Sequence, residues 1–177
     1  MVRVVAAVTM LAAAGCGTTD AQDTDAAHAP TTANAPAEPS TGPRQPVEGF
    51  GTLAYRISTM PTAERCALLA ESALQRARGL MNRTDLAGFD GMLFAFPEDH
   101  TGGFWMKDTP LPLSIAWFDA DGRFVSAADM EPCVGKADCP TYNAAGPYRY
   151  ALEVPQGGLG ALGIRPGALI AFGRPCT

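Results

Sequence analysis

The chain has 177 residues, 47% of them hydrophobic, and a formal net charge of −5. This length allows one ordinary domain with tails. A net acidic chain lacks the excess of Lys and Arg with which proteins bind nucleic acids, so the composition excludes a typical nucleic-acid-binding protein. From Gly51 onward there are 13 acidic and 11 basic residues, a net charge of −2, so most of the net negative charge of −5 precedes the domain.

Residues 1–16 resemble a bacterial lipoprotein signal peptide. Arg3 is followed by an apolar run that is shorter than the roughly 20 residues of a membrane-spanning helix, and small residues precede Cys16. Such signals are cleaved before the cysteine, whose thiol carries a lipid; Leu is usual at the position that Ala13 occupies. We therefore predict an exported protein, lipid-anchored through Cys16 at the outer face of the cell membrane. A secreted protein with an ordinary signal peptide is the alternative.

Residues 17–50 form a segment of different composition, rich in Ala, Thr, Pro and Asp. Such a segment buries too little apolar surface to offset its chain entropy, so we predict a disordered stalk. As a flexible coil it would span roughly 30–35 Å, enough to lift a domain above the lipid headgroups. A single globular domain is predicted over residues 51–177.

Short apolar runs with aromatic residues and frequent Gly and Pro indicate β-strands in this domain. The expected strands are Met92–Phe96, Leu113–Phe118, Phe124–Ala127, Tyr150–Val154 and Leu169–Phe172. Asp121-Gly122 lies between two of these runs and is a strong hairpin signal. The fold class is therefore mainly β, with little helix.

The segment 62–83 has two interpretations. Its apolar positions allow one long helix, but Ser72 and Gln75 have the spacing of a capping box, which starts a helix rather than continuing one. Gly79 would end that helix. We therefore predict a strand near residues 65–70 and a short helix from Ser72 to about Leu80.

Four cysteines follow Cys16: Cys66, Cys133, Cys139 and Cys176. In an exported domain, four cysteines allow three disulfide pairings. Cys133 and Cys139 flank a short polar loop, and Cys66 and Cys176 lie near the two ends of the domain, so we predict these two pairs. The cysteines lack the Cys-x-x-Cys spacing that is typical of zinc ligands, and the two histidines are His28 and His100. We therefore predict no metal site.

Several ordered motifs resemble the "domain of unknown function 192" family over about residues 65–173. They are Arg78-Gly-Leu-Met81, Gly91-Met-Leu-Phe94, Phe104-Trp-Met-Lys-Asp-Thr109, Pro112-Leu-Ser114, Leu152-Glu153 and Gly163-Ile-x-x-Gly167. The resemblance implies a small antiparallel β-sandwich or barrel-like domain with one or two short helices, and no established activity. The chain departs from the family pattern at Asp108, where Asn is usual, and at Ser114, where Asp is usual.

Arg78 and Trp105 each have two interpretations. Arg78 is a candidate anion-binding residue, or a structural ion-pair partner of Asp90, Asp108 or Glu153, and we favour the ion pair. Trp105 is a candidate for lining a sugar- or peptide-binding groove, but core packing is the more frequent role of such a residue.

The polar run Lys107-Asp108-Thr109 lies at a strand end and is a candidate ligand-binding segment, although Asp108 is also suited to bonding loop amides. Glu153 lies in an apolar strand. Simple alternation makes it a solvent-facing residue, and the alternative is a partly buried carboxylate paired with Arg78 or Lys107. Asp108 and Glu153 are candidate catalytic carboxylates if they lie about 5–10 Å apart.

We therefore predict a surface-tethered binding or accessory module without a cofactor. Its expected partners are the membrane, through the lipid, and a cell-wall glycan, a small ligand or an envelope protein. An envelope hydrolase directed at glycans, using Asp108 and Glu153, is the alternative function.

Overall fold

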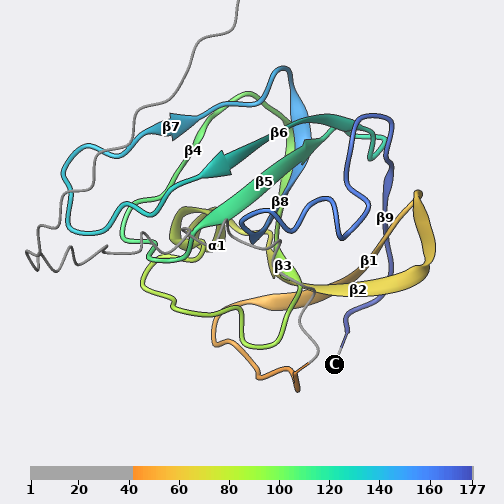
Figure 1. Ribbon diagram of the computed structural model, residues 1–177, viewed down its shortest axis with the longest axis horizontal. Helices are drawn as coiled ribbons and strands as arrows, with labels where there is room; N and C mark the ends of the chain where they lie inside the picture. Colours follow the sequence, from red (N-terminus) through yellow and green to blue (C-terminus); the bar gives the residue numbers. More distant parts are fainter. Residues whose placement is uncertain (1–41, 177) are drawn as a thin grey trace, which may run out of the picture. The chain divides into compact units, whose positions relative to one another are not determined.

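The computed structural model describes residues 42–176. Nine strands and one α-helix lie in this part of the chain (Figure 1). They are β1 (Gly51–Ile57), β2 (Met60–Ala70), α1 (Ala73–Arg78), β3 (Gly91–His100), β4 (Phe104–Trp105), β5 (Leu113–Phe118), β6 (Phe124–Met130), β7 (Thr141–Tyr142), β8 (Tyr148–Pro155) and β9 (Ile170–Phe172). The mainly β class is confirmed. Cys16, the signal peptide and residues 17–41 lie outside the described residues.

Seven strands form one sheet in the order β6-β5-β8-β3-β2-β1-β9, and β4 pairs with β7 in a second sheet. The sheet is mixed rather than wholly antiparallel, because β2 and β3 pair in parallel. A parallel pair needs a crossover connection, which α1 and the following loop supply. The expected hairpin is confirmed: β5 and β6 pair antiparallel, and Gly122 in the turn has a φ of +78°.

The two edge strands of the large sheet meet. An isolated antiparallel bridge joins Arg123, just before β6, to Leu169, just before β9. Phe124 N donates to Ala168 O at 3.0 Å, and Ile170 N donates to Gly122 O at 2.8 Å. The sheet is thus joined at its edges, as in a barrel-like domain.

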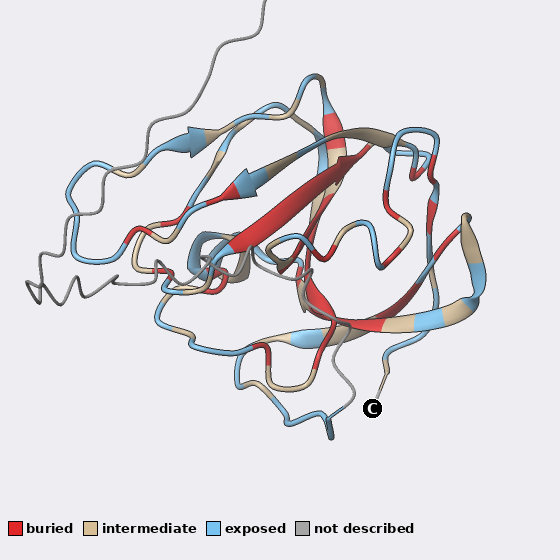
Figure 2. Ribbon diagram, viewed as in Figure 1, coloured by how far each residue is buried: buried red, intermediate tan, exposed pale blue. Residues whose placement is uncertain are grey.

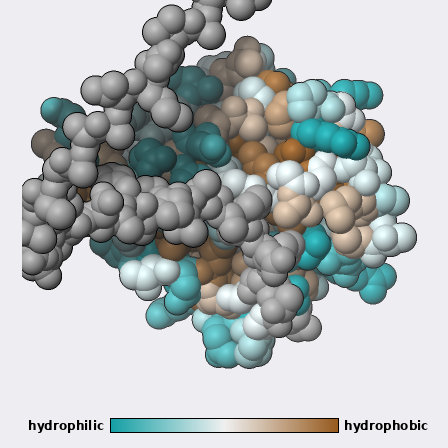
Figure 3. Space-filling view, in the orientation of Figure 1, coloured by the Kyte–Doolittle hydropathy of each residue, from teal (hydrophilic) through white to brown (hydrophobic). Residues whose placement is uncertain are grey.

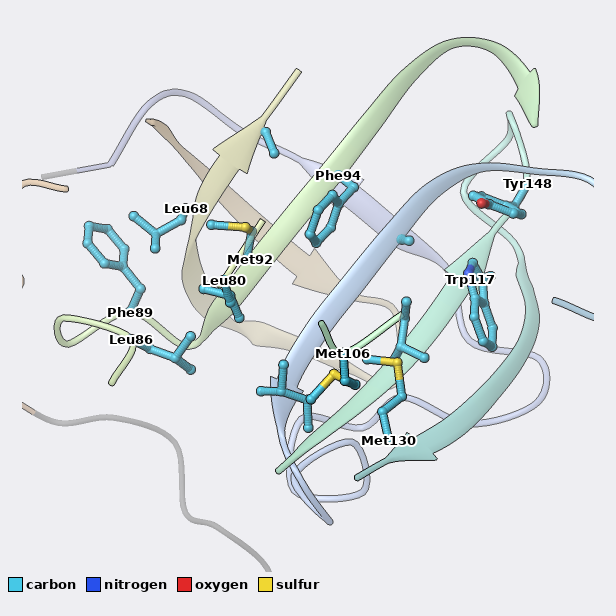
Figure 4. Packing of buried hydrophobic residues seen from close by; sticks show 14 of the residues in the cluster. Leu68, Leu80, Leu86, Phe89, Met92, Phe94, Met106, Trp117, Met130 and Tyr148 are labelled. Carbon is cyan, nitrogen blue, oxygen red and sulfur yellow. The ribbon is translucent and has the colours of Figure 1, made fainter. Parts of the chain in front are cut away.

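Both faces of the sheet are buried, and β5 is buried along its whole length (Figure 2). Alternate residues of each strand point to opposite faces and enter two separate hydrophobic clusters. The first, here the Trp117 cluster, includes Leu68, Met92, Phe94, Ile115, Trp117 and Ala151, together with Leu80, Leu86 and Phe89 from the loop after α1 (Figure 4). The second, the Leu152 cluster, includes Ala67, Leu93, Ala116, Phe118, Leu152 and Val154, together with Leu162 and Ile164.

Helix α1 begins and ends where the sequence indicates. The Ser72 side chain accepts a hydrogen bond from Gln75 N at 3.2 Å, and Gln75 Oε1 accepts one from Ser72 N at 2.8 Å, which completes the capping box. Gly79 terminates the helix with a φ of +46°. The predicted division of segment 62–83 is confirmed, although the strand before the helix begins earlier, at Met60.

The domain boundary lies before Gly51. Gln45 N donates to Ala87 O at 2.9 Å, and Val47 and Phe50 pack against the Trp117 cluster. Residues 45–50, which composition assigns to the stalk, therefore pack on the domain. Composition does not reveal this packing, because the segment is polar on average and only two apolar side chains, Val47 and Phe50, hold it against the core.

The predicted disulfides Cys66–Cys176 and Cys133–Cys139 are both present. No helix within residues 42–176 has the length and hydropathy that crossing a membrane requires. On the face seen in Figure 3, hydrophobic side chains gather near the middle and hydrophilic ones lie around them.

Candidate functional site

A small cavity of about 40 Å³ lies between the C-terminal end of α1, strand β4 and the middle of β8. It brings together four residues that the sequence singles out, whereas Lys107 and Asp108 do not line it. The lining residues are Arg76, Ala77, Arg78, Gly79, Leu80, Met81, Phe94, Phe104, Trp105, Thr109 and Glu153.

Glu153 lies at the centre of the sheet, in register with Met92 of β3 and Ile115 of β5. It is only 4% exposed and forms no hydrogen bond or ion pair with any residue in the described part of the chain. Burial without a compensating charge raises the pKa of Glu153 to about 8. The solvent-facing assignment is wrong because alternation along a strand gives a solvated face only where one side of the sheet is uncovered.

Arg78 makes none of the three ion pairs that we considered. Asp90 instead accepts a hydrogen bond from Cys66 N at 2.8 Å and lies 3.6 Å from an Arg65 nitrogen. The exposed Arg78 guanidinium lies over the Phe50 ring, 5.6 Å from its centroid. Such stacking orients a guanidinium while leaving its N–H donors available.

Trp105 is 53% exposed, so its favoured assignment to the core is wrong. The buried tryptophan is Trp117. Trp105 lies on the two-residue strand β4, where it pairs with Thr141 of β7 outside the large sheet. A tryptophan held on a paired strand but left half in solvent is a typical recognition residue, because it offers a large rigid surface.

The run Lys107-Asp108-Thr109 is held through its backbone. Asp108 N donates to Cys133 O at 2.8 Å, and Asn82 N donates to Asp108 O at 2.7 Å. Asp108 has a φ of +50°, a conformation that Asp and Asn tolerate better than most residues. Its side chain faces Lys107 at 3.9 Å and bonds no loop amide.

Thr109, in contrast, is buried and reaches the cavity. Its Oγ1 donates to Lys107 O at 3.2 Å, which leaves the oxygen lone pairs able to accept a hydrogen bond. Cys133 N donates to Thr109 O at 3.4 Å, so the loop closed by the Cys133–Cys139 disulfide holds the backbone of Thr109.

Sequence reasoning missed Arg76, Leu80, Met81 and Phe104 as lining residues. Arg76 Nη1 donates to the carbonyl oxygens of Glu71 and Ala95, so this arginine ties α1 to β3. Its position two residues before Arg78, on the turn that precedes Gly79, is the signal that would have included it.

Ser114, where the resemblance leads us to expect Asp, does not line the cavity. Its hydroxyl is bonded to the Asp129 carboxylate on β6, and Gly157 N donates to the same hydroxyl oxygen at 2.9 Å. The residue therefore joins β5 to its neighbours. Within the described residues, no group of three or more His, Cys, Asp or Glu side chains is arranged to hold a metal ion.

A protein-family model covers residues 57–172, which include every residue lining the cavity; its description is DUF192, "Uncharacterized ACR, COG1430". The chain belongs to the DUF192 family. No curated protein matches it. The family assignment agrees with the motif resemblance and assigns no activity.

Two crystal structures resemble this DUF192 chain. One, from Sinorhizobium meliloti 1021, is provisionally described as a transcription regulator; it has 28% identity and a TM-score of 0.59, over 70% of this chain and 95% of that one. The other, from Novosphingobium aromaticivorans, is a protein of unknown function; it has 29% identity and a TM-score of 0.58, over 76% of this chain and 93% of that one.

Proposed function

We propose that this protein is a glycan-binding module of the cell envelope, tethered to the membrane by a lipid on Cys16. The observation that carries the proposal is the half-exposed Trp105 beside a cavity that has an unpaired carboxyl, Glu153, at its floor. A flat indole packs against the apolar face of a sugar ring, and the adjacent polar groups bind its substituents.

Arg78 supports the same function. Its guanidinium is exposed at the cavity, stacked on Phe50 and without an ion pair among the described residues. Binding a ligand oxygen there would break no existing interaction of Arg78. A preoriented donor of this kind loses little conformational freedom on binding.

The location of the protein in the envelope rests on separate support. Two disulfides in a domain of this size are typical of an oxidising compartment outside the cytoplasm. The small residues before Cys16 favour a lipid anchor, and a secreted form is the alternative. The net charge of −5 gives no support to nucleic-acid binding.

We do not extend the proposal to hydrolysis. Glycoside hydrolases use two carboxyl groups that flank the scissile bond, about 5–10 Å apart. Glu153 lines the cavity, whereas Asp108 lies outside it, next to Lys107. A ligand substituent in the cavity would therefore meet one carboxyl group of this pair.

The test is sedimentation of the mature protein with purified peptidoglycan. Trp105→Ala should abolish retention with an unchanged melting temperature, because the indole is half exposed and contributes little to the core. Leu74→Ala is the matched control: Leu74 is 84% exposed on α1 and does not line the cavity. Retention of Trp105→Ala at the wild-type level, or loss of retention in both variants, would contradict the proposal.

A further inference from the structure

The size of the cavity limits what can enter it. The centre of a water-sized group can reach about 40 Å³ of it, roughly three times the 10–15 Å³ that one water molecule needs on this measure, so a substituent of a few atoms fits. A whole sugar ring therefore stays outside, against Trp105, and a single small substituent of that ring enters. The identity of this substituent determines which glycans the site accepts.

The floor of the cavity offers a hydrogen-bond donor. Strands β3 and β5 place Met92 and Ile115 beside Glu153, so the carboxyl lies among apolar side chains. The raised pKa of about 8 indicates that it keeps its proton at neutral pH. A protonated carboxyl donates through its hydroxyl, so the floor favours a ligand oxygen that accepts.

The other charged groups that line the cavity are both cationic, and neither forms an ion pair with the Glu153 carboxyl. Arg76 and Arg78, from α1, are the charged side chains that line the cavity with Glu153, while the loop after β4 contributes the neutral Thr109. Arg76 is already bonded to two backbone carbonyls. Two guanidinium groups at the cavity repel an ammonium group, so a free amino sugar is disfavoured.

The walls are apolar on one side and offer an acceptor on the other. Leu80, Phe94 and Phe104 supply the apolar surface, and Thr109 Oγ1 has lone pairs to spare. A substituent that suits this cavity has a carbonyl oxygen, an N–H and a methyl group. These are the three parts of an acetamido group.

We propose that the site selects N-acetylated amino sugars. The sugar ring lies on Trp105, and the acetamido group enters the cavity. Its carbonyl oxygen accepts a hydrogen bond from the Glu153 carboxyl, its N–H donates to Thr109, and its methyl group contacts Phe94. This inference rests on the proposed glycan-binding function and specifies its ligand class.

The test compares two neutral glycans that differ at this substituent. Chitin oligosaccharides carry the acetamido group, and cello-oligosaccharides carry a hydroxyl in its place. Titration of the mature protein, followed by tryptophan fluorescence at about pH 6, should show chitin oligosaccharides binding at least about tenfold more tightly. One buried hydrogen bond together with a buried methyl group accounts for a factor of this size.

Variants of Glu153 distinguish its role as a hydrogen-bond donor to the ligand from its contribution to packing. Glu153→Gln keeps a donor at the floor and should bind chitin oligosaccharides within a few-fold of wild type, whereas Glu153→Leu should lose about tenfold or more. Raising the pH from about 6 to about 9.5 should weaken binding by the wild type, whose carboxyl then ionises, and leave Glu153→Gln unaffected.

The outcomes distinguish this inference from the function on which it rests. Equal affinity for both glycans, abolished by Trp105→Ala, would overturn the acetamido inference and leave the glycan-binding function intact. Full binding by Glu153→Leu would likewise overturn the role of the carboxyl. No binding of either glycan or of peptidoglycan would overturn both proposals.

Discussion

The Trp117 cluster and the Leu152 cluster lie on opposite faces of one sheet, and strand β8 contributes to both. Leu152 and Val154 point into the Leu152 cluster, where they are fully buried. Glu153, between them, points to the other face, at the border of the Trp117 cluster and the cavity. The same strand thus stabilises the fold on one face and presents a polar group on the other.

The difference between the faces follows from what covers them. The segment that carries Leu162 and Ile164 packs directly onto the Leu152 cluster. The opposite face is covered by loops, by a short helix with no buried residue, and by the two-residue strand β4. Short elements fit less closely than a continuous segment, and the cavity lies where they meet.

The largest expected effect lies on the Leu152 face. Leu152→Ala removes a fully buried side chain and should lower the free energy of unfolding by about 2–5 kcal/mol. Denaturant unfolding of the oxidised protein measures this loss, with Leu74→Ala as the exposed control. A loss below about 1 kcal/mol would show that Leu152 is not closely packed and that the Leu152 face is no more tightly packed than the face with the cavity.

The second effect lies on the other face of the same strand and depends on pH. The pKa of Glu153 is raised to about 8 in the folded protein from an ordinary value of 4.5. Between these values the unfolded chain releases a proton that the folded protein keeps, so stability falls as pH rises and levels off above the folded pKa.

Glu153→Gln removes this ionisation. We expect it to be roughly 1–3 kcal/mol more stable than wild type near pH 8 and equal to it near pH 4.5, in denaturant unfolding at several pH values. A difference between the two proteins that stays constant with pH would show that the Glu153 carboxyl is solvated rather than buried.

The smallest effect lies at α1. Ser72→Ala removes the N-cap and should cost about 0.5–1 kcal/mol, whereas Ser72→Asp should restore most of it. Hydrogen exchange at Gln75 and Arg76 would locate the loss in the helix. An equal loss in both variants would indicate that Ser72 acts through packing rather than capping.

Local patterns predicted much of the fold. The apolar runs located β5 and β8, and the capping box located α1. Strands β4 and β7 were missed because two residues are too few to show a period. The parallel pairing of β2 and β3 was missed because local sequence does not encode which strands become neighbours.

The candidate site was predicted in part. Arg78, Trp105, Thr109 and Glu153 were named from the sequence, and they line one cavity. Their environments were not predictable: Trp105 looks like a core residue because its neighbours are apolar, and Glu153 looks solvated because alternation assumes one uncovered face. Both assignments depend on how long-range packing covers the sheet.

The bridge between Arg123 and Leu169 has a consequence for association with other chains. A sheet edge with unpaired amide and carbonyl groups is a template for pairing with another chain. Here β6 and β9, the outermost strands of the sheet, are linked to each other at their ends, and β9 is only three residues long. The beginnings of β6 and β9 are therefore paired with each other rather than open to another chain, which should limit strand addition at this corner of the sheet.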